Sequence, residues 1–471
     1  MKPTPNAGPV RSDRLFSRVF MGLFGAFLGL SLLKFGNPVI LDWKVESPTT
    51  LAGLISDPWP VRWGYWLLAV VALFGLPALA RAGWPRLRVL YLLLLAWLAW
   101  QFIAASKTID ASLTQATLPH LAVCVVCFFL GLLVVAHPTR SQLLWTGIIV
   151  GFSLTLVKGV NQHNFEYRRD YQMVLQGDRV GWKDATAEII QKWKSEGILI
   201  ETENGIRSNP VIVERLRRGR ISGTLVYPNA LAGAILLLFP AALSLVIRGT
   251  GAFRPVVRIL AGGLGTYLGL GCLFWTGSKG GWLIALGMAG AYVFARLPGS
   301  RRKKLTVVAL AGLLGLTVFV IRFSDFLFVN KAPSVSARFG FWKAAIQNTR
   351  DNPIFGSGPG TFWRAYRRLK SPEAEMSRLA HNDYLQQASD SGLPGFLLYT
   401  VFVAGSLFHL TRRIPSGDFR FPVLLGLLGW FSQGLIEFGL YIPGLAWPAF
   451  SLLGWLLATS GKQIDKPLPA G

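Results

Sequence analysis

The stretch SRLAHNDYLQQASDSGLPG, residues 377–395, is a polar segment with one histidine that interrupts long apolar runs. Hydrophobic residues make up 52% of the 471-residue chain and charged residues only 15%, and the mean hydropathy is +0.43. This composition is far too apolar for a soluble protein of this length. The sequence therefore predicts an integral membrane protein whose helices hold this polar segment at one face of the bilayer.

The apolar runs are long enough to cross a bilayer, which takes about 20 residues in a helix. They lie near residues 15–33, 61–80, 87–105, 118–136, 141–158, 225–247, 256–275, 280–296, 304–322, 393–411, 421–437 and 442–459. Because lipid offers no partners to free backbone groups, such spans are helical. The predicted fold is all-α, a polytopic transmembrane bundle of about twelve helices.

The lysines and arginines of the short connections fall mainly on one side of this bundle. With a cytoplasmic N-terminus, the run Arg301, Arg302, Lys303 and Lys304 faces the cytoplasm, as the positive-inside rule requires. The C-terminus is then cytoplasmic as well. Two long connections face outward, and the second contains the polar segment and is expected to be partly helical.

The chain is thus predicted to have five parts. They are N-terminal transmembrane helices (1–158), a first long outward loop (159–224), central transmembrane helices (225–322), an outward loop with the candidate site (323–392), and C-terminal transmembrane helices with a tail (393–471). Both outward loops are rich in lysine and arginine, although long outward segments are translocated whatever their charge. Their basicity therefore implies an anionic partner outside the membrane.

The formal net charge of +25 would suggest nucleic acid as the partner of a soluble protein. In a membrane protein much of that charge follows from orientation, so we expect membrane lipids as partners and no nucleic acid. The cysteines Cys124, Cys127 and Cys272 all lie in apolar runs. Because no second ligand pair follows the CxxC of the first two, we expect core packing there, with neither a disulfide nor a metal site.

His381, in the sequence AHNDYLQ, is the candidate catalytic residue. An imidazole can take a proton from an incoming hydroxyl near neutral pH, and Asn382 or Asp383 would orient it. However, residues one or two positions apart do not face each other on a helix, so Asp383 is expected mainly to start a helix. The alternative is a histidine that only lies at the membrane interface.

Three cations are candidates for binding an anion on the outward side. Arg220 opens RISGTLVYPNALAG, where the chain re-enters the membrane, and a guanidinium there can bind phosphate through two hydrogen bonds. Lys279 and Ser278 lie in the turn TGSKGG, whose glycines expose backbone N–H groups, and Arg338 lies in SARFGFWKAA. The alternatives are a headgroup anchor at Arg220, an ordinary turn at Lys279 and the polar edge of an amphipathic helix at Arg338.

Glu437, in FSQGLIEFGLYIPG, is an acidic residue near the outward end of a late predicted helix. Carboxylates in a membrane are costly and usually face a partner or a cavity. Glu437 would therefore neutralise one of the arginines, help to position His381, or form a purely structural salt bridge.

These motifs, taken together and in this order, resemble the superfamily of O-antigen ligases and O-antigen polymerase-like proteins. The residues that carry the resemblance are RISGTLVYPNALAG (220–233), TGSKGG (276–281), RFGFWKAAIQNTRDNPIFGSGPGTF (338–362) and AHNDYLQQASDSGLPG (380–395). The last two are long and precede the final helices, as they do in that superfamily.

The resemblance implies an inner-membrane glycosyltransferase of bacterial cell-envelope and lipopolysaccharide biosynthesis, with a periplasmic active site. It would move a glycan from an undecaprenyl-diphosphate carrier to a hydroxyl of lipid A-core or a similar lipid or glycan acceptor. No metal or cofactor is implied, and the anomeric carbon would be inverted. His381 would be the general base or the group that positions the acceptor, and Arg220 and Arg338 would bind the diphosphate. Lys279 stands where many relatives have arginine, and it keeps the charge without the forked geometry.

Three other functions stay open, and the first two belong to the same superfamily. A polysaccharide polymerase would use a second lipid-linked glycan as acceptor, and a protein O-oligosaccharyltransferase would use a serine or threonine. A lipid-linked glycan transporter would be a protein of another class. It should carry polar residues through the membrane, whereas the predicted helices are filled with Leu, Ala, Val, Gly and Phe.

Overall fold

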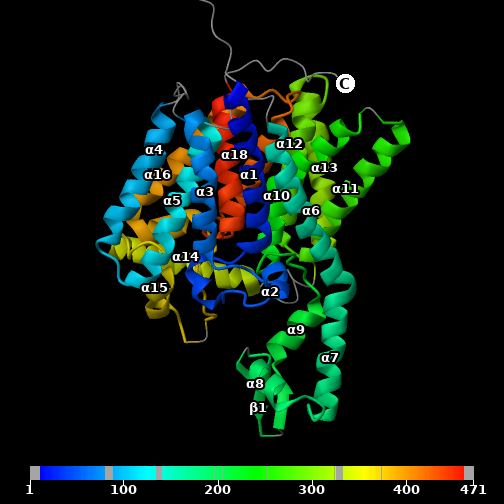
Figure 1. The fold of residues 1–471 in the computed structure, drawn as a ribbon, viewed down its shortest axis with the longest axis vertical. Helices are drawn as coiled ribbons and strands as arrows, with labels where there is room; N and C mark the ends of the chain where they lie inside the picture. The colour runs from blue at the N-terminus through cyan, green and yellow to red at the C-terminus, as the bar shows by residue number, and fades with distance from the viewer. Residues whose placement is uncertain are drawn as a thin grey trace, which may run out of the picture.

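The computed structural model describes residues 11–79, 88–133, 141–195, 197–203, 205–251, 253–322, 324, 333–372 and 374–460. All of these are helix, turn or irregular chain apart from one short hairpin (Figure 1). The helices of the bundle are α1 (Arg11–Lys34), α3 (Val61–Leu79), α4 (Arg88–Ala105), α5 (Ala111–Leu133), α6 (Ser141–Asn161), α10 (Pro228–Gly249), α11 (Pro255–Thr276), α12 (Lys279–Arg296), α13 (Arg301–Arg322), α16 (Asp383–Arg413), α17 (Phe421–Gln433) and α18 (Pro443–Thr459).

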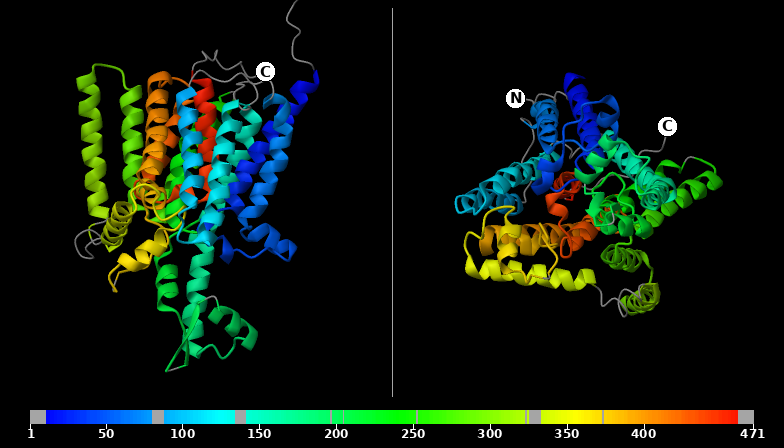
Figure 2. Two further views of the ribbon diagram at one scale, coloured as in Figure 1. Left: turned by 90° about the vertical axis from the view of Figure 1, so that its left-hand side faces the viewer. Right: turned by 90° about the horizontal axis from the view of Figure 1, so that it is seen from below.

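Further elements join these helices, mostly at one end of the bundle. They are η1 (Val39–Lys44), α2 (Leu51–Ser56), the π-helix η3 (Gln162–Glu166), α7 (Tyr167–Val180), α8 (Ala187–Ser195), β1 (Leu199–Thr202), β2 (Gly205–Ser208), α9 (Pro210–Arg218), α14 (Pro333–Asp351), α15 (Phe362–Leu369) and η5 (Gly439–Tyr441). Figure 2 shows α14, α15 and the α7–α9 region below the bundle, whereas the connection between α12 and α13 lies at the top.

The predicted all-α polytopic fold is confirmed. Within the described residues, eight helices are long and apolar enough to cross a membrane by length and composition, and they include α1, α4, α5, α6, α10, α11, α13 and α16. The remaining predicted spans coincide with α3, α12, α17 and α18, which are helices but are shorter or less apolar. The chain is a multi-pass membrane protein.

Glycines allow the bundle helices to pack closely. A Cβ on Gly29 of α1 would lie 2.1 Å from the carbonyl oxygen of Gly147 on α6, and one on Gly131 of α5 would lie 2.1 Å from the carbonyl oxygen of Ser451 on α18. In a membrane, small residues at helix contacts let backbones approach, because lipid supplies no hydrophobic drive for association. Nearly every residue of α18 is buried, and this helix lies in the middle of the bundle (Figure 2).

A kink in α16 receives the loop of residues 352–361. Ser391 and Gly392 leave helical geometry, with Gly392 at φ 69°. Backbone hydrogen bonds attach the loop there: Ser357 N–H donates to the Ser389 carbonyl at 3.0 Å and Gly358 N–H donates to the Asp390 carbonyl at 2.8 Å. The predicted span at 393–411 is therefore only the second half of α16, whose first half contains most of the polar segment.

Asp390, in that first half of α16, fixes the start of α15. Its buried carboxylate accepts from the N–H of Gly360 at 2.9 Å and of Phe362 at 3.0 Å. It also accepts from the Gln386 amide and the Tyr441 hydroxyl. A buried carboxylate is stable only when it is so fully bonded, and this one joins α15, α16 and η5 below the membrane helices.

Residues 167–218 form an arm that projects from the bundle (Figure 1). It consists of α7, α8, the antiparallel pair β1 and β2, and α9. Asp178 holds it together, because its carboxylate accepts from Ser208 N–H at 2.8 Å and from the Trp182 indole at 3.0 Å. The Trp182 ring packs edge-on against Trp193 at 5.3 Å. The arm therefore has its own small core.

Gly392→Ala is expected to destabilise the protein by at least about 2 kcal/mol. The native φ is 69°, and a Cβ would lie 2.1 Å from the Ile354 carbonyl oxygen. The measurement is thermal unfolding of the purified protein in detergent. Gly263→Ala is the control, since that α11 glycine has nothing within 4 Å of its Cβ position. Equal melting temperatures for the two variants would contradict the prediction.

Candidate functional site

The carboxylate of Glu437 is the centre of a polar cluster where α10, α14 and α16 meet. It lies between α17 and η5 and is only 4% exposed. Its Oε1 accepts from the Asn229 amide at 2.6 Å and from Nη2 of Arg338. Its Oε2 accepts from the Tyr227 hydroxyl at 3.3 Å and faces Nδ1 of His381 at 3.2 Å. A carboxylate this deep needs such partners, because an unpaired buried charge is strongly unfavourable.

The contact with Glu437 determines which ring nitrogen of His381 carries the hydrogen. An ionised carboxylate can only accept hydrogen bonds, so Nδ1 carries the hydrogen. In the neutral ring Nε2 is then the basic nitrogen. No hydrogen bond to Nε2 is found among the described residues, and 23% of the side chain is exposed. The ring is therefore oriented at one nitrogen and accessible at the other.

His381 is also held by its backbone and by aromatic neighbours. Its φ of 50° is in the left-handed region, which is uncommon for a residue other than glycine. The ring stacks on Phe341 at 5.6 Å and meets Phe438 edge-on at 4.7 Å. The Trp342 indole donates to its carbonyl oxygen at 3.4 Å. These contacts restrict the imidazole to one direction.

Arg220 joins the same cluster through Asn229. Its Nε donates to the Thr276 carbonyl at 2.7 Å and its Nη2 donates to Oδ1 of Asn229 at 3.1 Å. Burial lowers the pKa of the Arg220 guanidinium and the Glu437 charge opposes that shift, so the side chain stays cationic at neutral pH. Nη1 has no protein partner among the described residues and can bind a ligand.

Arg338, from the first turns of α14, is the second cation at this carboxylate. Its side chain is 18% exposed and forms an ion pair with Glu437 through Nη2. Its Nε is buried and lacks a hydrogen-bond partner in the described structure. The geometry thus brings His381, Arg220 and Arg338 together, as the sequence predicted for one outward site.

Ser278 and Lys279 lie beside the cluster at the start of α12. Ser278 caps this helix by accepting from Gly281 N–H at 3.3 Å, and Lys279 is its first residue. A Cβ on Gly280 would lie 2.2 Å from the Ile436 side chain. The N-terminus of α12 therefore packs against the turn that carries Glu437, and helix N-termini favour anions.

Asn382 and Asp383 act on the backbone. Asn382 caps α16 by accepting from the N–H groups of Tyr384 and Leu385. Asp383 accepts from Leu440 N–H at 3.1 Å, and its own N–H donates to the Gly434 carbonyl at 2.7 Å. In the described structure the imidazole Nδ1–H donates to Glu437. Asn382 and Asp383 instead bond the backbone at the start of α16 and at Leu440.

Sequence reasoning missed several residues of the cluster. Tyr227 bonds Glu437, and its signal was its place in the motif 220–233. His120 of α5 has no such signal. Its Nδ1 accepts from the Trp447 indole at 3.3 Å, so its Nε2 donates to the Leu440 carbonyl at 2.7 Å. His120 therefore fixes the chain that follows Glu437.

Comparison with known proteins agrees with the resemblance seen in the sequence. Residues 264–400 match the family described as O-antigen ligase. The match includes Lys279, Arg338 and His381, and Arg220 and Glu437 lie outside it. An uncharacterized protein of Haemophilus influenzae is 23% identical over 162 residues, which are 30% of this chain and 41% of the relative. The match thus spans less than half of that relative.

Glu437→Gln is expected to lower the melting temperature at pH 7, since breaking a buried ion pair costs about 3–5 kcal/mol. Burial raises the pKa of Glu437, but His381, Arg338 and Tyr227 lower it further, and the net pKa falls below 4.5. Stability from this group is complete above the unfolded value of 4.5 and is lost as pH falls through the folded pKa. The difference between wild type and variant should therefore be smaller at a pH below 4.5 than at pH 7.

Thermal unfolding in detergent at both pH values checks this expectation. Glu214→Gln is the matched control, because Glu214 on α9 pairs with Arg217 and Arg218 at an exposed surface, where ion pairs contribute little. A Glu437→Gln melting temperature equal to wild type at pH 7 would show that the cluster does not depend on this carboxylate.

Proposed function

We propose that this chain, a multi-pass membrane protein of the O-antigen ligase-like superfamily, is a glycosyltransferase of the ligase type. It moves a glycan from an undecaprenyl-diphosphate carrier to a hydroxyl of lipid A-core or a similar acceptor. The observation that carries the proposal is the convergence of His381, Arg220 and Arg338 on the buried carboxylate of Glu437. A base beside two cations suits transfer from an anionic leaving group.

His381 is the general base in this proposal. Its Nε2 takes the proton of the acceptor hydroxyl as the acceptor oxygen bonds to the anomeric carbon. The bond from that carbon to the diphosphate oxygen breaks, and the lipid diphosphate leaves with the electron pair. Attack opposite the leaving group inverts the anomeric carbon. Glu437 holds Nδ1–H and stabilises the imidazolium that forms.

Arg220 and Arg338 bind the diphosphate and stabilise its charge as it leaves. Lys279 and the N-terminus of α12 add positive potential beside them. Arg338 pairs with Glu437, and the Glu437 charge also acts on Arg220, so two guanidinium groups share one carboxylate and positive charge remains for an anionic ligand. Charge that develops in the transition state is then met by groups already in place.

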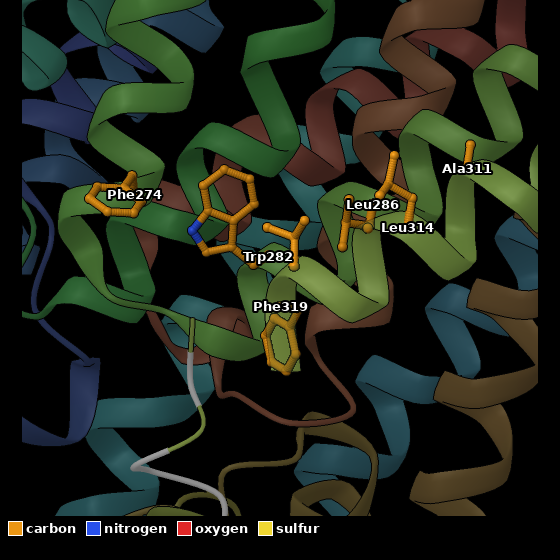
Figure 3. A pocket seen from close by; sticks show the side chains of 8 residues that line it. Phe274, Trp282, Leu286, Ala311, Leu314 and Phe319 are labelled. Atoms are coloured by element: carbon orange, nitrogen blue, oxygen red, sulfur yellow. The ribbon is translucent and has the colours of Figure 1, made fainter. Parts of the chain in front are cut away.

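An apolar groove next to the cluster suits the isoprenoid tail of the donor. The cavity of about 420 Å³ lies among α11, α12 and α13 (Figure 3). It is lined by Phe274, Trp282, Leu286, Ala311, Leu314, Gly315, Val318 and Phe319. Trp282 is one helical turn from Lys279, so a lipid in the groove would present its diphosphate to the cations. Apolar side chains favour a hydrocarbon chain.

The proposal places the protein in the bacterial inner membrane with both termini in the cytoplasm and the site in the periplasm. The basic connection between α12 and α13 lies at the bundle end opposite α14 and the arm (Figure 2), which fits the positive-inside rule. The same donor site would serve a polysaccharide polymerase or a protein O-oligosaccharyltransferase, and these differ in the acceptor.

His381→Ala is expected to reduce transfer at least about 100-fold, because a positioned general base contributes 10²–10⁴. The assay uses the purified protein in lipid nanodiscs with a lipid-linked glycan donor and an acceptor lipid. His409→Ala is the control, since His409 lies near the far end of α16, the helix that begins just after His381. Undiminished transfer by His381→Ala would exclude it as the base, and lipid translocation without any transfer would exclude the enzyme function.

A further inference from the structure

The turn of residues 220–223 is held by a single glutamine from another part of the chain. Gln162 is 7% exposed, and its Oε1 accepts from the N–H of Ser222 at 3.0 Å and of Gly223 at 2.7 Å. Its Nε2 donates to the Gly223 carbonyl at 2.9 Å. The amide is thus bonded at both ends to the two residues that follow Ile221.

Gln162 begins the π-helix η3, which joins α6 to α7. A π-helix inserts an extra residue into the helical turn, re-aims the side chains around it, and is often found at functional sites. Here the next residue, His163, stacks on Trp275 at 4.4 Å with the rings 14° apart. Trp275 in turn accepts from Ile221 N–H at 3.2 Å. The π-helix therefore contacts both the turn and the end of α11 that supports it.

The turn has little freedom to adjust if these bonds are removed. Gly223 has φ 62°, and a Cβ there would lie 2.8 Å from the Thr155 carbonyl of α6. Arg220 takes its direction from bonds to Thr276 and Asn229 at the other end of the turn. Loss of the Gln162 amide would leave two buried N–H groups unpaired, and pairing them would require the turn to move.

We propose that Gln162 is a positioning residue for donor binding, which holds Arg220 in register with the lipid diphosphate. The proposal rests on the proposed function, in which Arg220 binds that group. Binding through a guanidinium fork depends on position to within about 0.5 Å. A relaxed turn therefore weakens the diphosphate contact. His381 keeps its place, because its contacts come from α14 and from the chain just before η5.

The test measures binding of inorganic pyrophosphate to the full-length protein in detergent by isothermal titration calorimetry. Gln162→Met keeps the size of the side chain and removes the amide. Arg220→Ala tests the proposed diphosphate role itself. Gln142→Leu is the control, because Gln142 is exposed near the opposite end of α6. Melting temperatures establish that each variant is folded.

We expect Arg220→Ala and Gln162→Met to weaken pyrophosphate binding about tenfold or more, and Gln142→Leu to match wild type. In the transfer assay, Gln162→Met should raise the donor KM and leave kcat within about threefold. If Gln162→Met does not fold, Gln162→Asn, whose amide is one methylene too short, gives the same readout.

The outcomes separate the two proposals. Weak binding by Arg220→Ala together with wild-type binding by Gln162→Met would overturn the role of Gln162 and leave the proposed function standing. Wild-type binding by Arg220→Ala would overturn both. A lower kcat with unchanged KM and pyrophosphate affinity in Gln162→Met would also overturn the positioning role.

Discussion

The buried carboxylate of Glu437 is the group on which the polar end of this bundle depends. Its bonding partners come from the start of α10, from α14 and from His381 in the turn just before α16. A negative charge in this position would be untenable alone, and cations packed so closely would repel one another. Together they form a compact polar centre that closes one end of an apolar bundle. Glu437 lies in the break between α17 and α18. Asp383 and His120 bond the chain that follows Glu437, at Leu440.

The fold followed from the sequence because membrane helices are encoded locally. A run of about 20 apolar residues must be helical in lipid wherever it lies in the fold. The predicted spans therefore coincide with observed helices, and the span at 393–411 coincides with the second half of α16. The site is not encoded in this way. Glu437 finds its partners at separations of 210, 208, 99 and 56 positions, and no periodicity in the sequence reports such contacts. His381 and the arginines became candidates for the site because they are polar or charged residues at predicted membrane boundaries. Gln162 and His120 lie within helices, and their roles arise only from the fold around them.

The polar segment serves two purposes in one helix. The first half of α16, from Asp383 to Asp390, is buried against the loop of residues 352–361. It bonds that loop through side chain and backbone. After the kink at Ser391 and Gly392 the same helix continues as an apolar span. The glycines of the loop sequence DNPIFGSGPG permit backbone to meet backbone at this kink, and at Gly356 a Cβ would lie 2.5 Å from the Asp390 carbonyl carbon. The loop is thereby joined to α16 by main-chain contacts that depend on glycine at Gly356 and Gly392.

The arm leaves the bundle after Gln162 and returns before Ser222, and these two residues are bonded to each other. An insertion whose ends already touch adds only loop-closure entropy to the unfolded chain, and that cost grows with the logarithm of its length. The arm has its own small core around Trp182 and Asp178. The arm is therefore an insertion that carries its own packing, and a change in its length would cost the membrane bundle little.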